Sequence, residues 1–492
     1  MGFDLINLCK RAIEIDSRTD RGTRKLAEFF HPYLATVGFN KIFFQDLPSK
    51  EGAVSFDQNL IAIMGDELVD SKVQKGLMLY SSLDTPDAGD DREWSETNFN
   101  PFESVLESGK LFGLGASSGK LDFVCKLAAV QEAAVSPLRE PIYLVGTCGR
   151  EKLYSGARFF KKSGVLNPKV ALIHGATNMK VYRYGVGRLG CTLQLSFNTT
   201  EKDPAGFNAK TTLLIRGESG FAGTGSQEVS SVHLLFEILR ELSKSKIPYR
   251  VSHLHGGSSV DKIPEWTQAV VHVPEDLLPR LQAILYRYSE SQIAFESVIL
   301  KHTGVAFYPE GLFDYLQFVL EVFQKLSSQK ISSQSSKFQM ENRAFNLGLL
   351  REERGILSVS FSWWIPEGDN PEEFLKKLEL QLRNDEWRSD SVKKMSWDMQ
   401  FQKDLVLSPY EVESNGTAIS ILKDQGLAIA KKHKLIGEEA GLFYEEGREV
   451  LTLGAASSLE SLYLANDNIL VENLKQMKDH YVQLIKKYQK GN

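Results

Sequence analysis

Residues 76–86 read GLMLYSSLDTP, and residues 109–120 read GKLFGLGASSGK. The first stretch begins with an apolar run that has the length of a buried strand and stops at an acidic turn. Other apolar runs have the same character, at 59–64, 142–146 and 170–173. Stretches with helical spacing of apolar residues accompany the later runs, at 121–134 and 155–162. Apolar strands that alternate with helices predict a central, mixed and largely parallel α/β sheet.

A different pattern occupies the middle of the chain, where apolar and polar residues alternate along the strands. Residues 191–197 and 211–216 are examples, and the alternation is typical of a sheet with one exposed face. Strands and helices follow in two loosely similar series, which predicts an inserted, internally duplicated α+β lid domain. The α/β pattern then returns. We predict a catalytic-type domain in two parts, residues 1–185 and 406–492. The lid domain, residues 186–405, is inserted between these parts.

The composition is that of an ordinary globular protein of more than one domain. Of 492 residues, 42% are hydrophobic and 25% charged, and the net charge of −5 argues against a nucleic-acid-binding protein. No run of 18 apolar residues predicts a membrane span, and the first residues lack the pattern of a secretory signal. The four cysteines are scattered, without the spacing of a zinc site or a disulfide framework. We therefore expect a cytoplasmic protein.

Further motifs follow the two quoted stretches in order: Gly156-Ala157, His255-Gly256-Gly257, Asp261-Lys262-Ile263-Pro264 and Ala465-Asn466-Asp467. The series resembles the M-twenty family of zinc metallopeptidases, which contains carboxypeptidases, dipeptidases and aminoacylases with two zinc ions. The doubled lid is most similar to the monomeric dipeptidase branch. This resemblance implies a di-zinc exopeptidase fold and a monomer.

The resemblance also implies five zinc ligands, and four of those positions carry other residues: Ser82, Ser118, Gly175 and Tyr463. Glu151 is the one retained ligand. Asp84, which in the family orients the histidine that is replaced here, is retained as well. Zinc is bound by histidine, cysteine and carboxylate side chains, so one retained ligand does not hold it tightly. We therefore expect no metal and no other cofactor.

Three more positions depart from the family pattern. Arg150 stands where the family has its general base, and an arginine stays protonated at neutral pH and accepts no proton. The histidine that stabilises the oxyanion falls on Glu218, which exchanges a donor for an acceptor. The arginine that clamps the substrate carboxylate falls on Trp364. The former substrate pocket is thus expected to be changed as well as the metal site.

These positions predict a non-catalytic member of the family that keeps the scaffold and binds a small molecule or a protein in the old cleft. One alternative is an active metallohydrolase, a dipeptidase or N-acyl amino acid amidohydrolase with a rebuilt or single-metal site. A second alternative is a structural subunit of an assembly. The sequence names no ligand or partner, and it favours neither nucleic acid nor membrane.

Several residues have both a functional and a structural interpretation. His253 and His255 flank Leu254 on an expected strand, and they fit a metal site or, more simply, a pair on the sheet surface. His174 fits a relic ligand or a histidine with a local hydrogen bond. A serine or cysteine nucleophile is the third alternative, from Ser82, Ser117, Ser118 or Cys148. Trp363 and Trp364 fit stacking on a ligand or packing inside the lid.

Overall fold

The computed structural model describes the chain in thirteen ranges: 3–48, 55–65, 74–133, 137–197, 206–218, 220–224, 230–288, 292–300, 305–330, 342–383, 397–430, 439–457 and 464–491. Within these ranges the chain forms two compact units. Unit 1 takes the chain up to Gly187 and again from Leu407 onward, and unit 2 takes Arg188 to Val406. In the part of the chain that the structure describes, no helix is long and apolar enough to cross a membrane.

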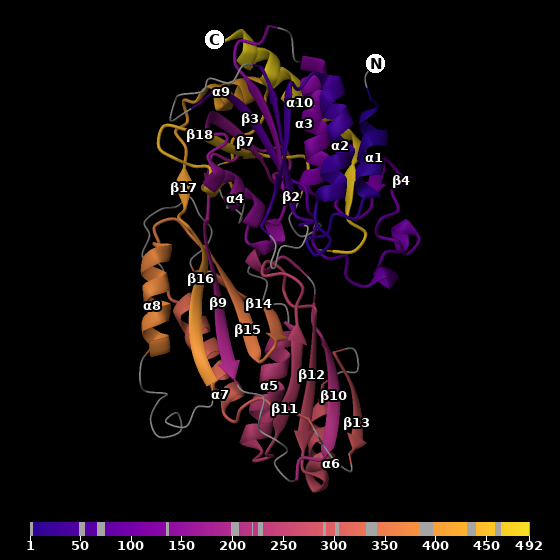
Figure 1. Cartoon of the computed structure of the whole chain (residues 1–492), viewed down its shortest axis with the longest axis vertical. Coiled ribbons are helices and arrows are strands. Elements are labelled where there is room, and N and C mark those ends of the chain that lie inside the picture. The colour runs from indigo at the N-terminus through magenta and orange to yellow at the C-terminus, as the bar shows by residue number, and fades with distance from the viewer. Residues whose placement is uncertain are drawn as a thin grey trace. The chain divides into compact units, whose positions relative to one another are not determined.

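Unit 1 is built on a six-stranded sheet in the order β1-β2-β6-β3-β7-β18 (Figure 1). The strands are β1 (Lys41–Asp46), β2 (Gln58–Met64), β3 (Gln74–Ser82), β6 (Ile142–Thr147), β7 (Pro168–His174) and β18 (Glu449–Leu453). The four strands β6, β3, β7 and β18 are parallel to one another, and β1 and β2 complete an antiparallel edge. Every residue of β2, β6 and β18 is buried, as expected of strands covered on both faces. The predicted mixed sheet is confirmed.

Helices cover this sheet: α1 (Leu5–Ile13), α2 (Arg24–Val37), α3 (Gly119–Ala133), α4 (Ser155–Ser163), α9 (Thr417–Asp424) and α10 (Val471–Lys490). The helix α3 lies at the centre, because α1, α2 and α10 all pack against it (Figure 1). Nearly all of its residues are buried. Two small sheets complete the unit: β8 (Tyr184–Gly185) with β17 (Tyr410–Glu411), and β4 (Val105–Glu107), β5 (Lys110–Phe112) and β19 (Asn468–Leu470). The end of the chain is thereby fixed to its first half.

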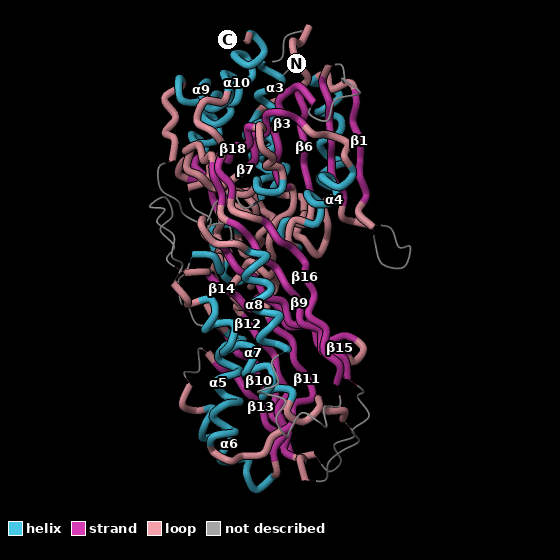
Figure 2. Tube along the Cα trace, turned by 90° about the vertical axis from the view of Figure 1, so that its left-hand side faces the viewer, coloured by secondary structure: helices cyan, strands magenta, loops and turns pink. Residues whose placement is uncertain are grey.

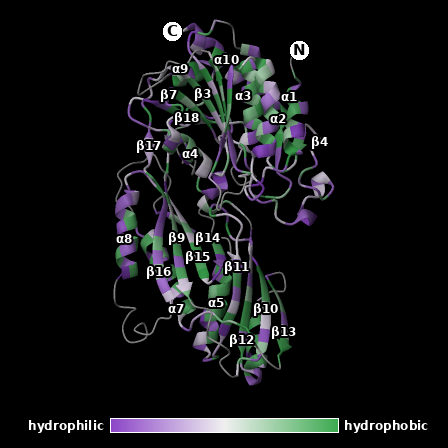
Figure 3. Cartoon of the chain, in the orientation of Figure 1, coloured by the Kyte–Doolittle hydropathy of each residue, from purple (hydrophilic) through white to green (hydrophobic). Residues whose placement is uncertain are grey.

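Unit 2 contains an eight-stranded sheet in the order β13-β10-β12-β11-β14-β15-β9-β16. Its strands are β9 (Gly187–Phe197), β10 (Ala209–Arg216), β11 (Arg250–Gly256), β12 (Trp266–Val273), β13 (Ile293–Ile299), β14 (Ala344–Glu353), β15 (Ile356–Ile365) and β16 (Trp397–Leu407). Its helices are α5 (Ser231–Lys244), α6 (Leu278–Leu285), α7 (Leu312–Ser327) and α8 (Pro371–Arg383). Figure 2 shows these helices on one face of the sheet, and Figure 3 shows both hydrophilic and hydrophobic residues along α8.

The two halves of unit 2 have the same topology. One half is β10-α5-β11-β12-α6-β13, and the other is β9-α7-β14-β15-α8-β16. In each half the fourth strand lies next to the first, followed by the third and the second. The halves meet where β11 pairs with β14 at Gly256 and Leu350. The predicted duplication is confirmed, with one half inserted after the first strand of the other.

Candidate functional site

The carboxyl ends of β3, β6 and β7 meet at one edge of the unit 1 sheet, the usual place for a site in an α/β fold. Ser82 is the last residue of β3 and pairs with Thr147 at the end of β6. Asp84 and Arg150 follow these two strands, and Gly175 follows β7. The structure therefore places these predicted site residues at one edge, which we call the strand-end site.

Ser118 reaches the same place because of a close backbone approach. The residue after it, Gly119, opens α3, and a Cβ atom there would lie 2.2 Å from the carbonyl oxygen of Ser82. Only a glycine allows the two segments to come so near. The Ser118 hydroxyl donates to the Gly115 carbonyl at 2.8 Å. It is thus engaged with its own loop.

Asp84 is held by two hydrogen bonds beneath the surface. Its side chain is buried, and it accepts from the Thr19 hydroxyl at 2.7 Å and from the backbone N–H of Arg150 at 3.1 Å. Burial is the main cause that raises the pKa of Asp84, to about 6. The nearby charge of Glu151 adds to this rise, and the hydrogen bond from Thr19 opposes it. Asp84 therefore fixes the turn that carries Arg150.

The guanidinium of Arg150 lies between two buried carboxylates. Its Nη1 is 3.3 Å from Oε1 of Glu151, and its Nε is 4.0 Å from Oε2 of Glu439. The other oxygen of Glu439 accepts from the Tyr80 hydroxyl at 2.6 Å, and that hydroxyl is 2.5 Å from Thr147 Oγ1. The side chain of Arg150 is itself only 12% exposed, so these charges meet largely away from water. The guanidinium of Arg150 thus lies close to the carboxylates of both Glu151 and Glu439.

Sequence reasoning missed Glu439. It comes from a short 3-10 helix, Glu439–Leu442, far along the chain from Arg150. The sequence signal that could have pointed to Glu439 is the pair of adjacent acidic residues at 438 and 439.

A second buried group of charges lies under the loop before α3. Asp467 accepts from the backbone N–H groups of Gly115 at 3.0 Å and Ser117 at 3.2 Å. Burial raises the pKa of Asp467 to about 7, although the hydrogen bonds from Ser117 and Gly115 oppose the rise. Burial lowers the pKa of the fully buried Lys120 to about 7, against the charge of Asp467. Asp467 thus closes the loop that carries Ser118 through these two backbone hydrogen bonds.

His174 belongs to a buried network centred on Asp122. The carboxylate of Asp122 lies 2.7 Å from Lys126 Nζ and 3.6 Å from His174 Nδ1, and it accepts from the hydroxyls of Ser81 and Tyr481. Burial lowers the pKa of His174, and Asp122 opposes the shift. Contact with a carboxylate in the core fits the local, structural interpretation of this histidine.

The candidate nucleophiles are buried as well. The backbone N–H and the Sγ of Cys148 both donate to Asn59 Oδ1, at 3.1 and 3.3 Å. Burial raises the pKa of the Cys148 thiol far above its usual value, which leaves it protonated and unreactive. Ser82 and Ser117 are 2% and 3% exposed, so neither offers an open hydroxyl.

In unit 2, Trp364 is enclosed by its neighbours. Its side chain is fully buried, and the guanidinium of Arg188 lies 3.7 Å from the centre of a Trp364 ring. Arg188 also forms a buried ion pair with Asp261, and the Phe221 ring contacts Trp364 edge to face at 5.3 Å. Trp363 is equally buried and donates to Ser327 Oγ at 2.9 Å. These contacts are those of packing inside the unit.

The remaining candidates lie on the surface or outside the described ranges. Glu218 is exposed. His253 and His255 are half-buried on β11, and the His255 ring stacks on Trp266 with centroids 5.1 Å apart, as expected of residues on a sheet surface. Tyr463 lies outside the described residues, so its predicted role stays untested.

The described side chains at the strand-end site do not fit a two-zinc centre. Ser82 and Ser118 present neutral hydroxyls, and Arg150 brings a positive charge next to Glu151. Across the described ranges, no three histidine, cysteine, aspartate or glutamate residues form a group that could hold a metal ion. The chemistry of this donor set differs from the three or four N, S or O ligands that zinc requires.

Residues 78–487 match the sequence pattern described as peptidase family M20/M25/M40. The chain belongs to this family. Two curated relatives are acetylornithine deacetylases, one from Proteus mirabilis at 25% identity and one from Erwinia tasmaniensis at 24%, each over 264 residues. The matched region covers 50% of this chain, and 59% and 60% of those two proteins.

Solved structures share the fold over nearly the whole chain. A di-peptidase from Saccharomyces cerevisiae, Dug1p, has a TM-score of 0.56 at 12% identity and covers 99% of this chain and 96% of its own. Human carnosine dipeptidase 1 has a TM-score of 0.50 at 14% identity, with 99% and 97% covered. The architecture of an α/β unit with an antiparallel lid sheet is therefore that of the family, and its structural neighbours include dipeptidases.

Proposed function

We propose that this chain is a family member without hydrolytic activity, which keeps the scaffold and binds a small molecule or a protein partner. One observation carries the proposal: the guanidinium of Arg150 lies between Glu151 and Glu439. The family resemblance assigns the general base to the position of Arg150. A base has to accept a proton from the attacking water, and a guanidinium at neutral pH has no capacity to do so.

The same ion pairs supply the charge that a metal would bring. Buried carboxylates are costly unless a positive charge lies beside them. In a metal site the ion supplies that positive charge, whereas here the side chain of Arg150 supplies it. The strand-end site is then stable without metal. Ser82, Ser118, Gly175 and Tyr463 at the assigned ligand positions agree with this proposal.

The substrate side of the proposal rests on Glu218 and Trp364. The resemblance places an oxyanion-stabilising histidine and a carboxylate-binding arginine at these positions. Here Glu218 is an exposed acid, and the ring of Trp364 is buried under Arg188. A monomer in the cytoplasm, without a metal cofactor, completes the proposal.

The test combines metal content with hydrolysis. We expect that protein purified without chelator contains no stoichiometric zinc when measured by elemental mass spectrometry. We also expect that it hydrolyses neither dipeptides nor N-acetyl amino acids when zinc is added. About two zinc ions per chain with chelator-sensitive turnover would reject the proposal in favour of an active metallohydrolase.

Glu151→Gln separates the two cases further. If Glu151 is a metal ligand, the substitution lowers the zinc content of the protein. If Glu151 only forms an ion pair, the substitution lowers the stability of the protein and not its zinc content. Glu93→Gln, at an exposed acid, is the control for loss of one negative charge. A change of bound zinc in the first variant and not in the second would contradict the ion-pair role.

A further inference from the structure

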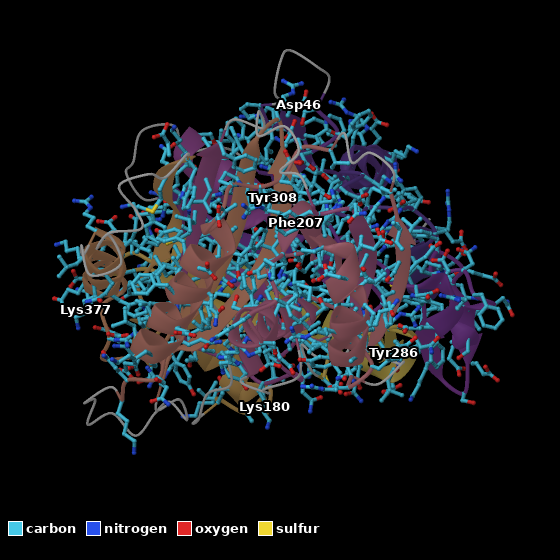
Figure 4. All side chains as sticks on the ribbon, turned by 90° about the horizontal axis from the view of Figure 1, so that it is seen from below. Asp46, Lys180, Phe207, Tyr286, Tyr308 and Lys377 are labelled. Carbon is cyan, nitrogen blue, oxygen red and sulfur yellow. The ribbon has the colours of Figure 1, made fainter. Side chains whose placement is uncertain are left out.

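Unit 2 contains a cavity of about 380 Å³, away from the residues discussed so far. It lies where the end of α5, the start of β11 and the segment leading into α7 come together, and Figure 4 labels Phe207 and Tyr308 of its lining. The rings of Tyr308 and Phe313 contact edge to face, with centroids 5.5 Å apart. Phe207 and Tyr249 add two more aromatic side chains to the lining. The volume lies within the range of sites for small molecules.

Charges of both signs line the same cavity. Lys246 and Arg250 are positive, and Glu310 and Asp314 are negative. Nη2 of Arg250 lies 2.9 Å from Oε2 of Glu310. Nε of Arg250 is shielded from solvent and has no acceptor in the part of the chain that the structure describes, and the guanidinium lies 5.5 Å from the centre of the Phe207 ring. The Arg250 side chain is 16% exposed, and a guanidinium has five N–H donors, so the contact with Glu310 does not use all of its capacity for anionic partners.

The two acids lie close enough to affect each other. Burial raises the pKa of Asp314, and the like charge of Glu310 raises it further. Burial also raises the pKa of the Tyr249 phenol to about 12, and the negative charge of Asp314 adds to that rise. Repulsion between Glu310 and Asp314 is relieved by a cation placed beside both.

We infer that this cavity binds a free amino acid in its zwitterionic form, with an apolar or aromatic side chain. The ligand carboxylate accepts hydrogen bonds from Arg250, and the ligand ammonium lies beside Glu310 and Asp314. The side chain packs against the rings of Phe207 and Tyr308. A pure anion would meet the two acids, a pure cation would meet Arg250, and an uncharged molecule would use neither charge.

The experiment uses L-phenylalanine as the probe and isothermal calorimetry on the full chain. N-acetyl-L-phenylalanine lacks the ammonium, and L-phenylalanine amide lacks the carboxylate. We expect binding of the free amino acid and a loss of about tenfold or more for each blocked form, since each loses a charge-assisted contact. Equal affinity of all three compounds, or no binding of L-phenylalanine at millimolar concentration, would overturn the inference.

Variants assign the binding to this cavity. Arg250→Gln is expected to weaken L-phenylalanine about tenfold and to leave the weak binding of the amide unchanged. Arg240→Gln is the matched control, because Arg240 also pairs with exposed glutamates on unit 2 and is not part of the cavity lining. Thermal melts of both variants check that they fold. Unchanged affinity in a folded Arg250→Gln protein would overturn the inference, and because Arg150 lies in unit 1, neither result bears on the proposed loss of hydrolysis.

Discussion

Arg150 contacts three buried acids through different parts of the residue. Its backbone N–H binds Asp84, and its guanidinium pairs with Glu151 and Glu439. The closeness of Asp84, Arg150 and Glu151 could be predicted, because they follow neighbouring parallel strands whose ends share one edge. Glu439 could not be predicted, since it arrives from a distant segment without any periodic pattern. The ion pairs therefore depend on tertiary packing that local sequence does not describe.

Replacing Arg150 with methionine should destabilise unit 1 strongly. The substitution keeps an unbranched apolar stem and removes the guanidinium that pairs with the buried carboxylates of Glu151 and Glu439, which costs about 3–5 kcal/mol. Urea unfolding followed by circular dichroism measures the loss. Lys152→Met is the control, because Lys152 pairs with Asp57 near the surface and its loss should cost about 0–1 kcal/mol. Equal stability of the two variants would argue against a compensating role for Arg150.

The buried Asp467 should make stability depend on pH. Its pKa is about 7 in the folded chain, above the ordinary 3.8, so between these values the folded state holds a proton that the unfolded state has released. The stability contributed by protonated Asp467 is therefore present below about pH 4 and is lost as the pH rises toward about 7, by at most about 1.4 kcal/mol per pH unit. Unfolding of the wild type and Asp467→Asn at pH 4.5, 6 and 7.5 measures the difference. A difference between them that does not change with pH would contradict this assignment.

Among the elements, long buried strands and helices could be predicted well, whereas their ends and grouping were harder to predict. The helix α9 ends at Asp424, because Gly426 adopts a left-handed conformation with φ of 83° that terminates it. The two halves of unit 2 could be suspected from their similar series of elements. The nested arrangement could not, because only strand pairing reveals that β9 belongs with β16 and not with β10.

Gly119 joins two elements, and its substitution tests how closely they approach. A Cβ atom at this position would lie 2.2 Å from the Ser82 carbonyl oxygen, so Gly119→Ala should force β3 and α3 apart and cost about 1–3 kcal/mol or more. Gly109→Ala is the control, since its φ is 76° and no atom lies within 4 Å of the added methyl group, which limits the cost to about 1 kcal/mol. Thermal melting of both proteins measures the difference, and a milder effect at Gly119 would show that the backbone yields.

On the scale of the whole molecule, each unit has a hydrophobic core of its own. The core of unit 1 joins helices from both ends of the chain, and that of unit 2 joins its two halves. In the sequence, the pattern changes from apolar strands to alternating strands near residue 186, and the first segment of unit 1 ends at Gly187. What the sequence did not indicate is how the chain leaves and returns to unit 1. Gly185 pairs with Tyr410, and a Cβ atom on Gly187 would lie 2.7 Å from the Leu407 carbonyl oxygen.

Each unit should therefore fold alone. A fragment of residues 188–406 is expected to unfold cooperatively, because it contains a complete eight-stranded sheet with its own core. Unit 1 with these residues replaced by a short glycine-serine linker is expected to do the same. Circular dichroism during heating measures both, and a broad, non-cooperative transition in either protein would contradict the prediction.

The pairing of β8 with β17 also has a consequence for the evolution of the fold. Two chain positions that lie side by side in a finished fold can accept a whole gene segment between them without any change in strand order. Inside unit 2 the order of elements shows another interruption, because one half of the unit follows directly after β9 of the other half. The architecture is thus reachable from a shorter ancestral protein by two successive insertions, one between β8 and β17 and one after β9.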